Sequence, residues 1–200
     1  MLLSLPVLSW HPNLVMTDLL RFLQNRNSAP RLTEPGPTAP EMVEIFQAAL
    51  RVPDHAWLRP WRFLTIAGER RAEFGGLLAQ ALTLREPAAE QHAIDRAAAA
   101  PLRAPLLVVV IARITEHPKV PPVEQRLSAG CAAQAVLLAA EALGYAGVWR
   151  TGDAAFDRFV MASLDLAATE EIIGFLYLGT RVGVAKPLPE LDTADFVSSW

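Results

Sequence analysis

Apolar side chains recur at helical spacing along much of the first half of the chain. These patterns predict helices over residues 17–26, 41–50, 69–82 and 88–100. The first helix would be capped by Thr17 or Asp18, whose short side chains can accept a hydrogen bond from a free N–H of the first turn. The second helix ends before Pro53, because proline cannot continue a helix.

Short apolar runs alternate with these helices and predict strands. They cover residues 62–68, 105–112, 145–151 and 171–180. The run PLLVVVIA at 105–112 has the length and β-branching of a buried strand. The pattern of elements alone permits a doubly wound α/β fold.

A long helix is predicted over residues 121–143, from its opening prolines to Gly144. Its middle, around Ala129 to Ala133, consists almost entirely of small residues. Small side chains let another backbone approach closely, so this helix packs on the sheet or on a second subunit. The sequence leaves both possibilities open.

The composition narrows the class of protein. A length of 200 residues with 52% hydrophobic and 20% charged content suits one domain with a sizeable core. The net charge of −3 and the lack of long Lys/Arg runs argue against nucleic acid as a partner. The first ten residues are apolar but lack the basic start of a signal peptide, and no apolar run is long enough to span a membrane. The single cysteine, Cys131, cannot form an internal disulfide, which favours the cytoplasm.

Several common chemistries lack their motifs. There is no glycine-rich phosphate loop, so a bound phosphate would be held by side chains, and arginine is the natural choice. The four histidines do not have metal-site spacing, and no serine lies in a G-x-S-x-G turn. An anionic aromatic cofactor that brings its own reactivity fits the remaining features, above all the arginine- and tryptophan-rich stretch RVPDHAWLRPWRF at 51–63.

Six segments together resemble one known family. They are NRNSAPR (25–31), RVPDHAWLRPWRF (51–63), RAPLLVVVIA (103–112), KVPPVEQRLSAGCAA (119–133), GYAGVWRTG (144–152) and IIGFLYLGT (172–180). In order and spacing they resemble the nitroreductase family of FMN-dependent oxidoreductases, and within it the small bacterial NAD(P)H nitroreductases. The resemblance runs from about residue 17 to the C-terminus. We therefore expect a nitroreductase domain at 17–200 after an N-terminal extension at 1–16.

The resemblance implies an α+β fold with a mixed central sheet flanked by helices. It also implies a homodimer with two FMN molecules at the interface, each held by both chains. Such an enzyme takes hydride from NADH or NADPH onto FMN and reduces a nitroaromatic, a quinone or a similar small molecule. The C-terminal tail carries apolar Phe196, Val197 and Trp200, so we expect it to form an arm that is buried on dimerisation.

The same resemblance assigns three groups of FMN-binding residues. Arg26, Asn27 and Ser28 match the family's N-R-R-S opening, which contacts the phosphate and the ribityl chain, with Asn27 in place of the second arginine. Arg51 and His55 match contacts made from the second subunit.

The third group consists of Trp149, Arg150 and Thr151, which match the family's W-R-S and would line the isoalloxazine and the phosphate end. Arg181 and Lys186 are further phosphate candidates.

Three other residues of the 51–63 stretch have different expected roles. Trp61 is expected in the core, and Asp54 is expected to orient its neighbours. Arg59 stands where the family has glutamine. No catalytic side chain is expected, because the chemistry lies on the flavin.

Two alternatives remain open. One is an FMN enzyme of the same fold with different chemistry, such as reductive dehalogenation or flavin fragmentation. The other is a dimer that binds or stores flavin with negligible turnover.

Overall fold

The computed structural model describes the backbone of residues 12–200 and side-chain burial from residue 18 onward. The described chain forms two compact units. We call residues 28–185 the core unit, and the described residues up to 27 together with 186–200 the terminal unit. No helix of the described residues is both long and apolar enough to cross a membrane.

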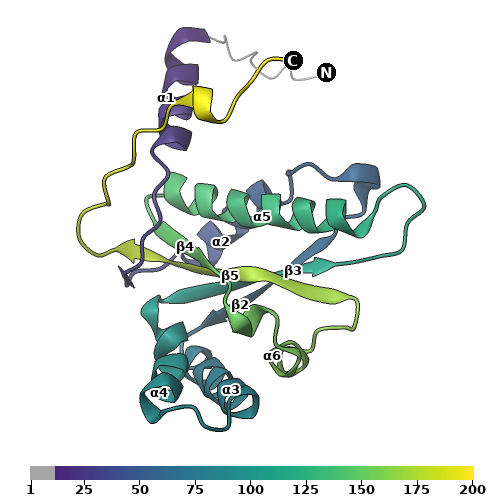
Figure 1. Ribbon diagram of the computed structural model, residues 1–200. Coiled ribbons are helices and arrows are strands. Elements are labelled where there is room, and N and C mark those ends of the chain that lie inside the picture. The colour runs from purple at the N-terminus through teal and green to yellow at the C-terminus, as the bar shows by residue number, and fades with distance from the viewer. Residues whose placement is uncertain (1–11) are drawn as a thin grey trace, which may run out of the picture. The chain divides into compact units, whose positions relative to one another are not determined.

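A five-stranded sheet forms the centre of the core unit (Figure 1). Its strands are β1 (Leu32–Thr33), β2 (Trp61–Ala67), β3 (Leu106–Arg113), β4 (Ala146–Arg150) and β5 (Glu170–Arg181). The order is β1-β5-β3-β2, with β4 also paired to β5. Every pairing among the described strands is antiparallel. The α+β class is therefore confirmed, but the sheet within this chain is not mixed, and a doubly wound fold is excluded.

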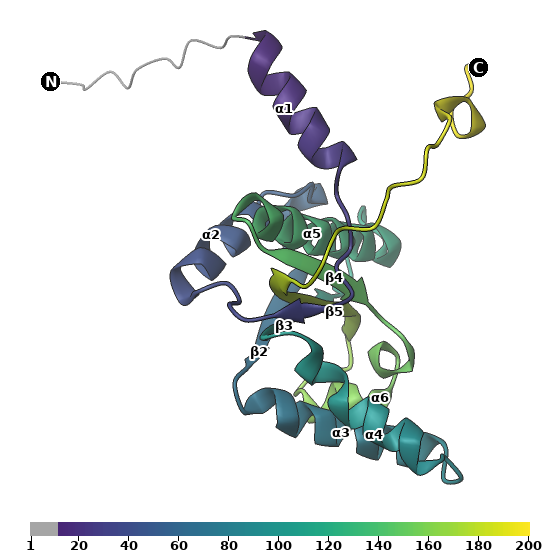
Figure 2. The same ribbon diagram turned by 90° about the vertical axis from the view of Figure 1, so that its left-hand side faces the viewer.

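Helices cover both faces of the sheet (Figures 1 and 2). On one face lie α2 (Ala39–Ala49) and α5 (Pro122–Ala142). On the other lie α3 (Arg70–Arg85) and α6 (Arg158–Ser163), with α4 (Gln91–Ala99) packed on α3.

The connection from β2 to β3 explains why these neighbours are antiparallel. It passes through α3 and α4, which pack against each other and return the chain to the end of the sheet that it left. Gly75 permits the close contact, because a Cβ atom there would overlap the backbone carbonyl of Ala98. Glycine lowers helix propensity, but at this position it permits the close packing of α3 on α4.

Strand β3 is buried from Leu106 to Ala112, as its continuous apolar run predicts. Alternate side chains face opposite layers. Leu107, Val109 and Ile111 belong to the core on the α3 side, whereas Leu106, Val108 and Val110 belong to the core on the α5 side. One strand therefore supplies both cores.

The long helix α5 packs on the sheet through its small residues, which resolves one of the alternatives left open above. Ala129, Ala132 and Ala133 are fully buried, and Gly144 ends the helix with φ of +87°. The opposite side of α5 exposes Val123, Leu127 and Cys131.

The terminal unit contains α1 (Pro12–Gln24) and a tail with one short 3₁₀ turn, Thr193–Asp195. Helix α1 begins five residues before Thr17, so Thr17 and Asp18 lie inside the helix and do not cap it. Proline at the first position of a helix costs no hydrogen bond, and Pro12 can therefore start the helix.

Two expectations concern the terminal unit: the domain boundary near residue 16 and the C-terminal arm. The expected boundary at residue 16/17 falls within α1, and residues 1–11 lie outside the described part of the chain. The expected arm is extended and leaves Phe196 and Trp200 exposed.

Candidate active site

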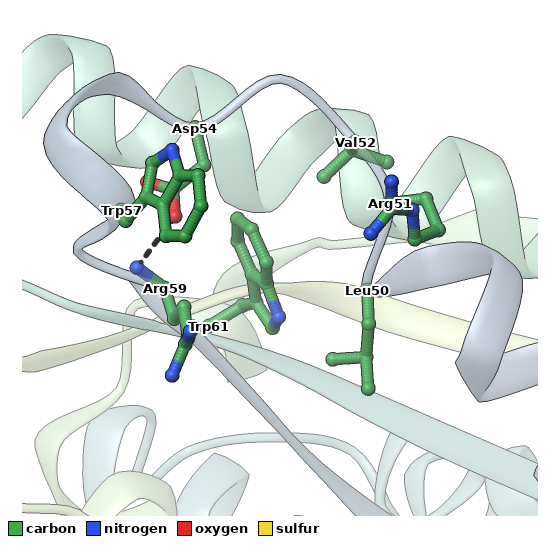
Figure 3. Close-up of a pocket in the computed structure, with 7 residues that line it drawn as sticks. All are labelled: Leu50, Arg51, Val52, Asp54, Trp57, Arg59 and Trp61. Carbon is green, nitrogen blue, oxygen red and sulfur yellow. Dashed lines mark hydrogen bonds between the residues drawn. The ribbon is translucent and has the colours of Figure 1, made fainter.

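The loop between α2 and β2 forms a pocket of about 310 Å³ (Figure 3). We call it the indole pocket. It is lined by Leu50, Arg51, Val52, Asp54, Trp57, Arg59 and Trp61. Two guanidinium groups and two indole rings thus meet in one concavity, with one carboxylate beside them.

The backbone of this loop is strained. Ala56, Trp57 and Arg59 have φ values of 59°, 56° and 49°, in the left-handed region that non-glycine residues rarely adopt. Each such residue costs about 1–3 kcal/mol and persists only where its surroundings enforce it. Trp57 in this loop is 80% exposed. Strained backbone of this kind is found most often at ligand-binding and active sites.

Two hydrogen bonds hold the loop in this conformation. The Arg59 N–H donates to Oδ2 of Asp54 over 2.8 Å (Figure 3). The Ser128 hydroxyl of α5 donates to the carbonyl of Pro53. Asp54 therefore orients its neighbours, as expected. Ser128 was not predicted, because nothing in the sequence of α5 indicates a loop carbonyl as its partner.

The charge of the indole pocket is only partly compensated. The guanidinium groups of Arg51 and Arg59 make no hydrogen bond or ion pair to any residue that the structure describes. Asp54 already accepts a backbone hydrogen bond. Trp61 is 6% exposed and packs against α5, so its predicted core position is confirmed. The pocket therefore presents positive charge beside aromatic faces, which suits an anionic aromatic ligand.

His55 lies at the start of the 3₁₀ turn His55–Trp57, close to the N-terminal end of α5. Its Nδ1 is 2.7 Å from Oε2 of Glu124, and both side chains are about half exposed. This contact fastens the loop to α5 at a second point. Sequence reasoning missed Glu124, although an acidic residue in a first helical turn is a common signal.

Strand β4 presents Trp149 and Arg150 on opposite faces of the sheet. Trp149 packs with the core on the α5 side, and its indole N–H donates to the carbonyl of Ile173 over 3.3 Å. A side chain at Gly174 would overlap this indole, so the glycine leaves room for the ring. Trp149 can therefore offer a ring face to a ligand, but its only donor is already used.

Arg150 lies over the ring of Tyr177 on the α3 side, with its guanidinium carbon 5.9 Å from the ring centroid. Thr151 follows β4 and is exposed. The three matched residues Trp149, Arg150 and Thr151 therefore do not present their side chains as one group.

The predicted phosphate-binding segment spans the two units. In the terminal unit, Arg26 is half buried, and the Asn27 amide donates to the carbonyl of Lys186 over 2.6 Å. In the core unit, Ser28 is followed by Ala29, whose N–H donates to the carbonyl of Gly147 over 2.9 Å. Ser28 therefore lies beside β4, the strand that carries Trp149.

No group of three or more His, Cys, Asp or Glu side chains suited to a metal ion occurs between residues 12 and 200 as far as their side chains are described. Of the eight predicted residues, the core unit brings Arg51 and His55 together in one loop and places Ser28 near β4. The α2–β2 loop, β4 and α5 therefore carry the residues of the candidate active site.

Comparison with known proteins identifies similar sequences and similar structures. The nitroreductase family profile matches residues 24–180. A protein of Escherichia coli K12 that bears the name NAD(P)H nitroreductase YdjA is 43% identical over 179 residues, which covers 86% of this chain and 97% of that protein.

Solved structures share the fold. A nitroreductase-like protein from Bacillus cereus superposes with a TM-score of 0.78 at 18% identity and covers 91% of this chain and 95% of that one. A nitroreductase from Desulfovibrio desulfuricans in complex with FMN gives a TM-score of 0.70 at 20% identity, over 90% and 96% of the two chains.

Proposed function

Because this chain belongs to the nitroreductase family, we propose that it is an FMN-dependent oxidoreductase. It takes a hydride from NADH or NADPH and passes two electrons to a nitroaromatic, a quinone or a similar small molecule. The observation that carries this proposal is the indole pocket, where uncompensated arginines lie beside indole rings on a strained loop. The name of the E. coli relative and the FMN complex of the D. desulfuricans protein support the choice of cofactor and reductant.

The residues present fit FMN. The cofactor is an aromatic tricycle joined to a phosphate, so it needs flat apolar surface at one end and cations or hydroxyls at the other. The core unit offers the ring of Trp149 and the hydroxyls of Ser28 and Thr151 near β4. Arg51 and His55 offer a cation and a polar ring on the α2–β2 loop. FMN, when bound, supplies the hydride-accepting and electron-donating chemistry that no side chain here can perform.

We assign the phosphate to Arg26, Asn27 and Ser28, with Arg26 as the cation that balances its charge. Asn27 acts through its backbone, because its side-chain amide is engaged with the Lys186 carbonyl. Arg150 contacts FMN only through its backbone, because its guanidinium lies on the face of the sheet opposite Trp149.

The guanidinium of Arg51 stabilises negative charge that develops at the site during reduction, because it carries no competing partner among the described residues. The loop around it is already held by Asp54 and Ser128. Preorganisation of this kind avoids the cost of ordering the charge at the moment of reaction.

A homodimer completes this site. Three described elements expose large apolar side chains: α5 through Val123 and Leu127 (55% and 64% exposed), α1 through Leu19 (54%), and the tail through Phe196 and Trp200. Exposed apolar groups on several elements favour burial against a second copy of the chain. In that dimer, Arg51 and His55 of one chain bind the FMN held by the other chain's Arg26, Ser28, Trp149 and Thr151.

Stopped-flow reduction tests the function. We expect the FMN-loaded protein to be reduced by NADPH or NADH within seconds under anaerobic conditions and to be reoxidised by a quinone. A flavin-storage protein would stay oxidised on that timescale, and this outcome would contradict the proposal.

A matched pair of variants tests the site. Arg51→Gln should weaken FMN binding about tenfold or more, the scale of a lost hydrogen bond to a charged group. Arg70→Gln removes another exposed arginine, which pairs with Glu73 on α3, and should leave FMN binding unchanged. Equal affinities in the two variants would remove Arg51 from the site.

A further inference from the structure

A second cavity lies in the core unit on the α3 side of the sheet, the face opposite Trp149. We call it the α3 cavity. Its volume is about 480 Å³, within the range of small-molecule sites. Phe74 and Leu78 of α3 and Phe175 of β5 supply apolar walls, and Arg150 and Tyr177 project from the sheet.

Arg150 is an uncompensated cation in this cavity. Its Nε is inaccessible to solvent and has no hydrogen-bond partner, and its guanidinium has no ion pair with any described residue. Among the described residues, its guanidinium contacts the face of Tyr177 alone. A half-buried guanidinium without an acceptor is costly, and a bound anion would remove that cost.

The other arginines of the cavity differ in how their charge is compensated. Arg85 pairs with Asp153 over 3.3 Å and with Asp157 over 3.2 Å. Arg103, at the edge of the cavity, has no such carboxylate among the described residues. Arg150 and Arg103 are therefore the two cations of the cavity that have no carboxylate partner among the described residues.

Tyr177 provides a neutral donor next to this charge. Burial raises the pKa of its phenol, although Arg150 and Arg103 act in the opposite direction. The hydroxyl therefore stays protonated at neutral pH, and it makes no hydrogen bond to a described residue. A protonated phenol beside a guanidinium can donate to the same anion.

We propose that the α3 cavity binds an aromatic carboxylate, with the carboxylate on Arg150, Tyr177 and Arg103 and the ring against Phe74 and Phe175. The α3 cavity shares Thr151 with the proposed FMN site, but its anion-binding groups lie on the opposite face of the sheet from Trp149, and the inference goes beyond the proposed oxidoreductase function. The apolar walls favour an aromatic carboxylate over inorganic phosphate, because phosphate would leave that surface uncovered.

Calorimetric titration of the full-length, FMN-saturated protein with benzoate tests the proposal. We expect saturable binding of benzoate, with benzyl alcohol and inorganic phosphate each about tenfold or more weaker. Arg150→Gln should weaken benzoate binding about tenfold or more, and Tyr177→Phe should weaken it several-fold. Arg70→Gln is the control, because Arg70 lies on α3 outside the residues that line the cavity and pairs with Glu73, and it should bind benzoate like the wild type.

Other outcomes overturn the proposal. They are no benzoate binding, phosphate binding as strong as benzoate binding, or loss of benzoate binding in Arg59→Gln, which would place the ligand in the indole pocket. Wild-type benzoate affinity in Arg150→Gln together with loss of FMN would make Arg150 an FMN residue instead. If Arg150→Gln does not fold, Tyr177→Phe and Arg103→Gln take its place. Unchanged benzoate affinity in both of these variants would also overturn the proposal. Arg51→Gln separates the two proposals, because this variant should bind FMN more weakly and bind benzoate with unchanged affinity.

Discussion

The part-buried ion pair between Arg62 and Glu170 is predicted to stabilise the sheet that carries the candidate active site. Arg62 of β2 donates from Nε and from a terminal nitrogen to the two carboxylate oxygens of Glu170, both over 2.7 Å. The side chain of Glu170 is 10% exposed and that of Arg62 is 29% exposed. The pair joins β2 to β5 across β3, directly after the loop that forms the indole pocket.

The substitution Glu170→Gln should destabilise the protein by about 2–4 kcal/mol. It leaves Arg62 without a counter-charge in a largely buried position and removes at least one charge-assisted hydrogen bond. It also disturbs the hydrogen bond from the Ala167 N–H to Oε2 of Glu170, which spans 3.0 Å.

The neighbouring residue provides a matched control. Glu171 forms the same two-point contact with Arg126, again over 2.7 Å, but the side chains are 36% and 43% exposed. Exposed pairs contribute about 0–1 kcal/mol, so Glu171→Gln should change the free energy of unfolding by no more than that. Urea unfolding of both variants at one protein concentration and with excess FMN measures the difference. Equal destabilisation by the two variants would refute the argument from burial.

The same pair predicts a pH dependence. Hydrogen bonds from Arg62 hold the pKa of Glu170 below its ordinary value, against the opposing effect of burial. A folded-state pKa below the unfolded one stabilises the protein above the unfolded pKa of about 4.3, and this contribution is lost as the pH falls through the folded pKa. The stability difference between wild type and Glu170→Gln should be constant near neutral pH and shrink below about pH 4.

Two further substitutions test the proposed dimer and its cofactor. Arg26→Ala should weaken FMN binding by about 1.5–3 kcal/mol, measured by fluorescence titration, and an unchanged affinity would remove Arg26 from the phosphate site. Deletion of residues 195–200, which include exposed Phe196 and Trp200, should weaken the dimer and FMN retention together, because ligand binding to the dimer stabilises the dimer. Light scattering that shows an unaltered dimer would exclude the arm from the interface.

Much of the fold could be predicted from periodicity alone. The apolar run of β3 predicts a buried strand, and this is confirmed. The small residues of α5 predict close packing on the sheet or on a second subunit, and the structure shows packing on the sheet. The start of α1 was wrong by five residues because two polar residues inside the helix resembled a cap. The two-residue strand β1 was missed because it has too few side chains to show a period.

The antiparallel sheet could not be predicted, because strand direction depends on how connections pack. The α3–α4 pair returns the chain to the end of the sheet that it left, and Gly75 lets these two helices pack closely. No local pattern encodes that contact. Motif matching likewise grouped Trp149 with Arg150, although alternation along β4 points them to opposite faces.

The strain of the α2–β2 loop was also invisible in the sequence. Alanine, tryptophan and arginine do not signal a left-handed backbone, yet Ala56, Trp57 and Arg59 all adopt it. The hydrogen bonds of Asp54 and Ser128, which link residues apart in the sequence, impose this conformation. Motif resemblance identified the stretch, and only the structure shows how it exposes Trp57.

The most direct test of the proposed function is the visible absorbance spectrum of the purified protein, followed by denaturation and identification of the released chromophore. The account predicts a flavin spectrum, FMN as the released cofactor, and one FMN per chain. A colourless protein that does not take up added FMN, or one that releases a different cofactor, would contradict it.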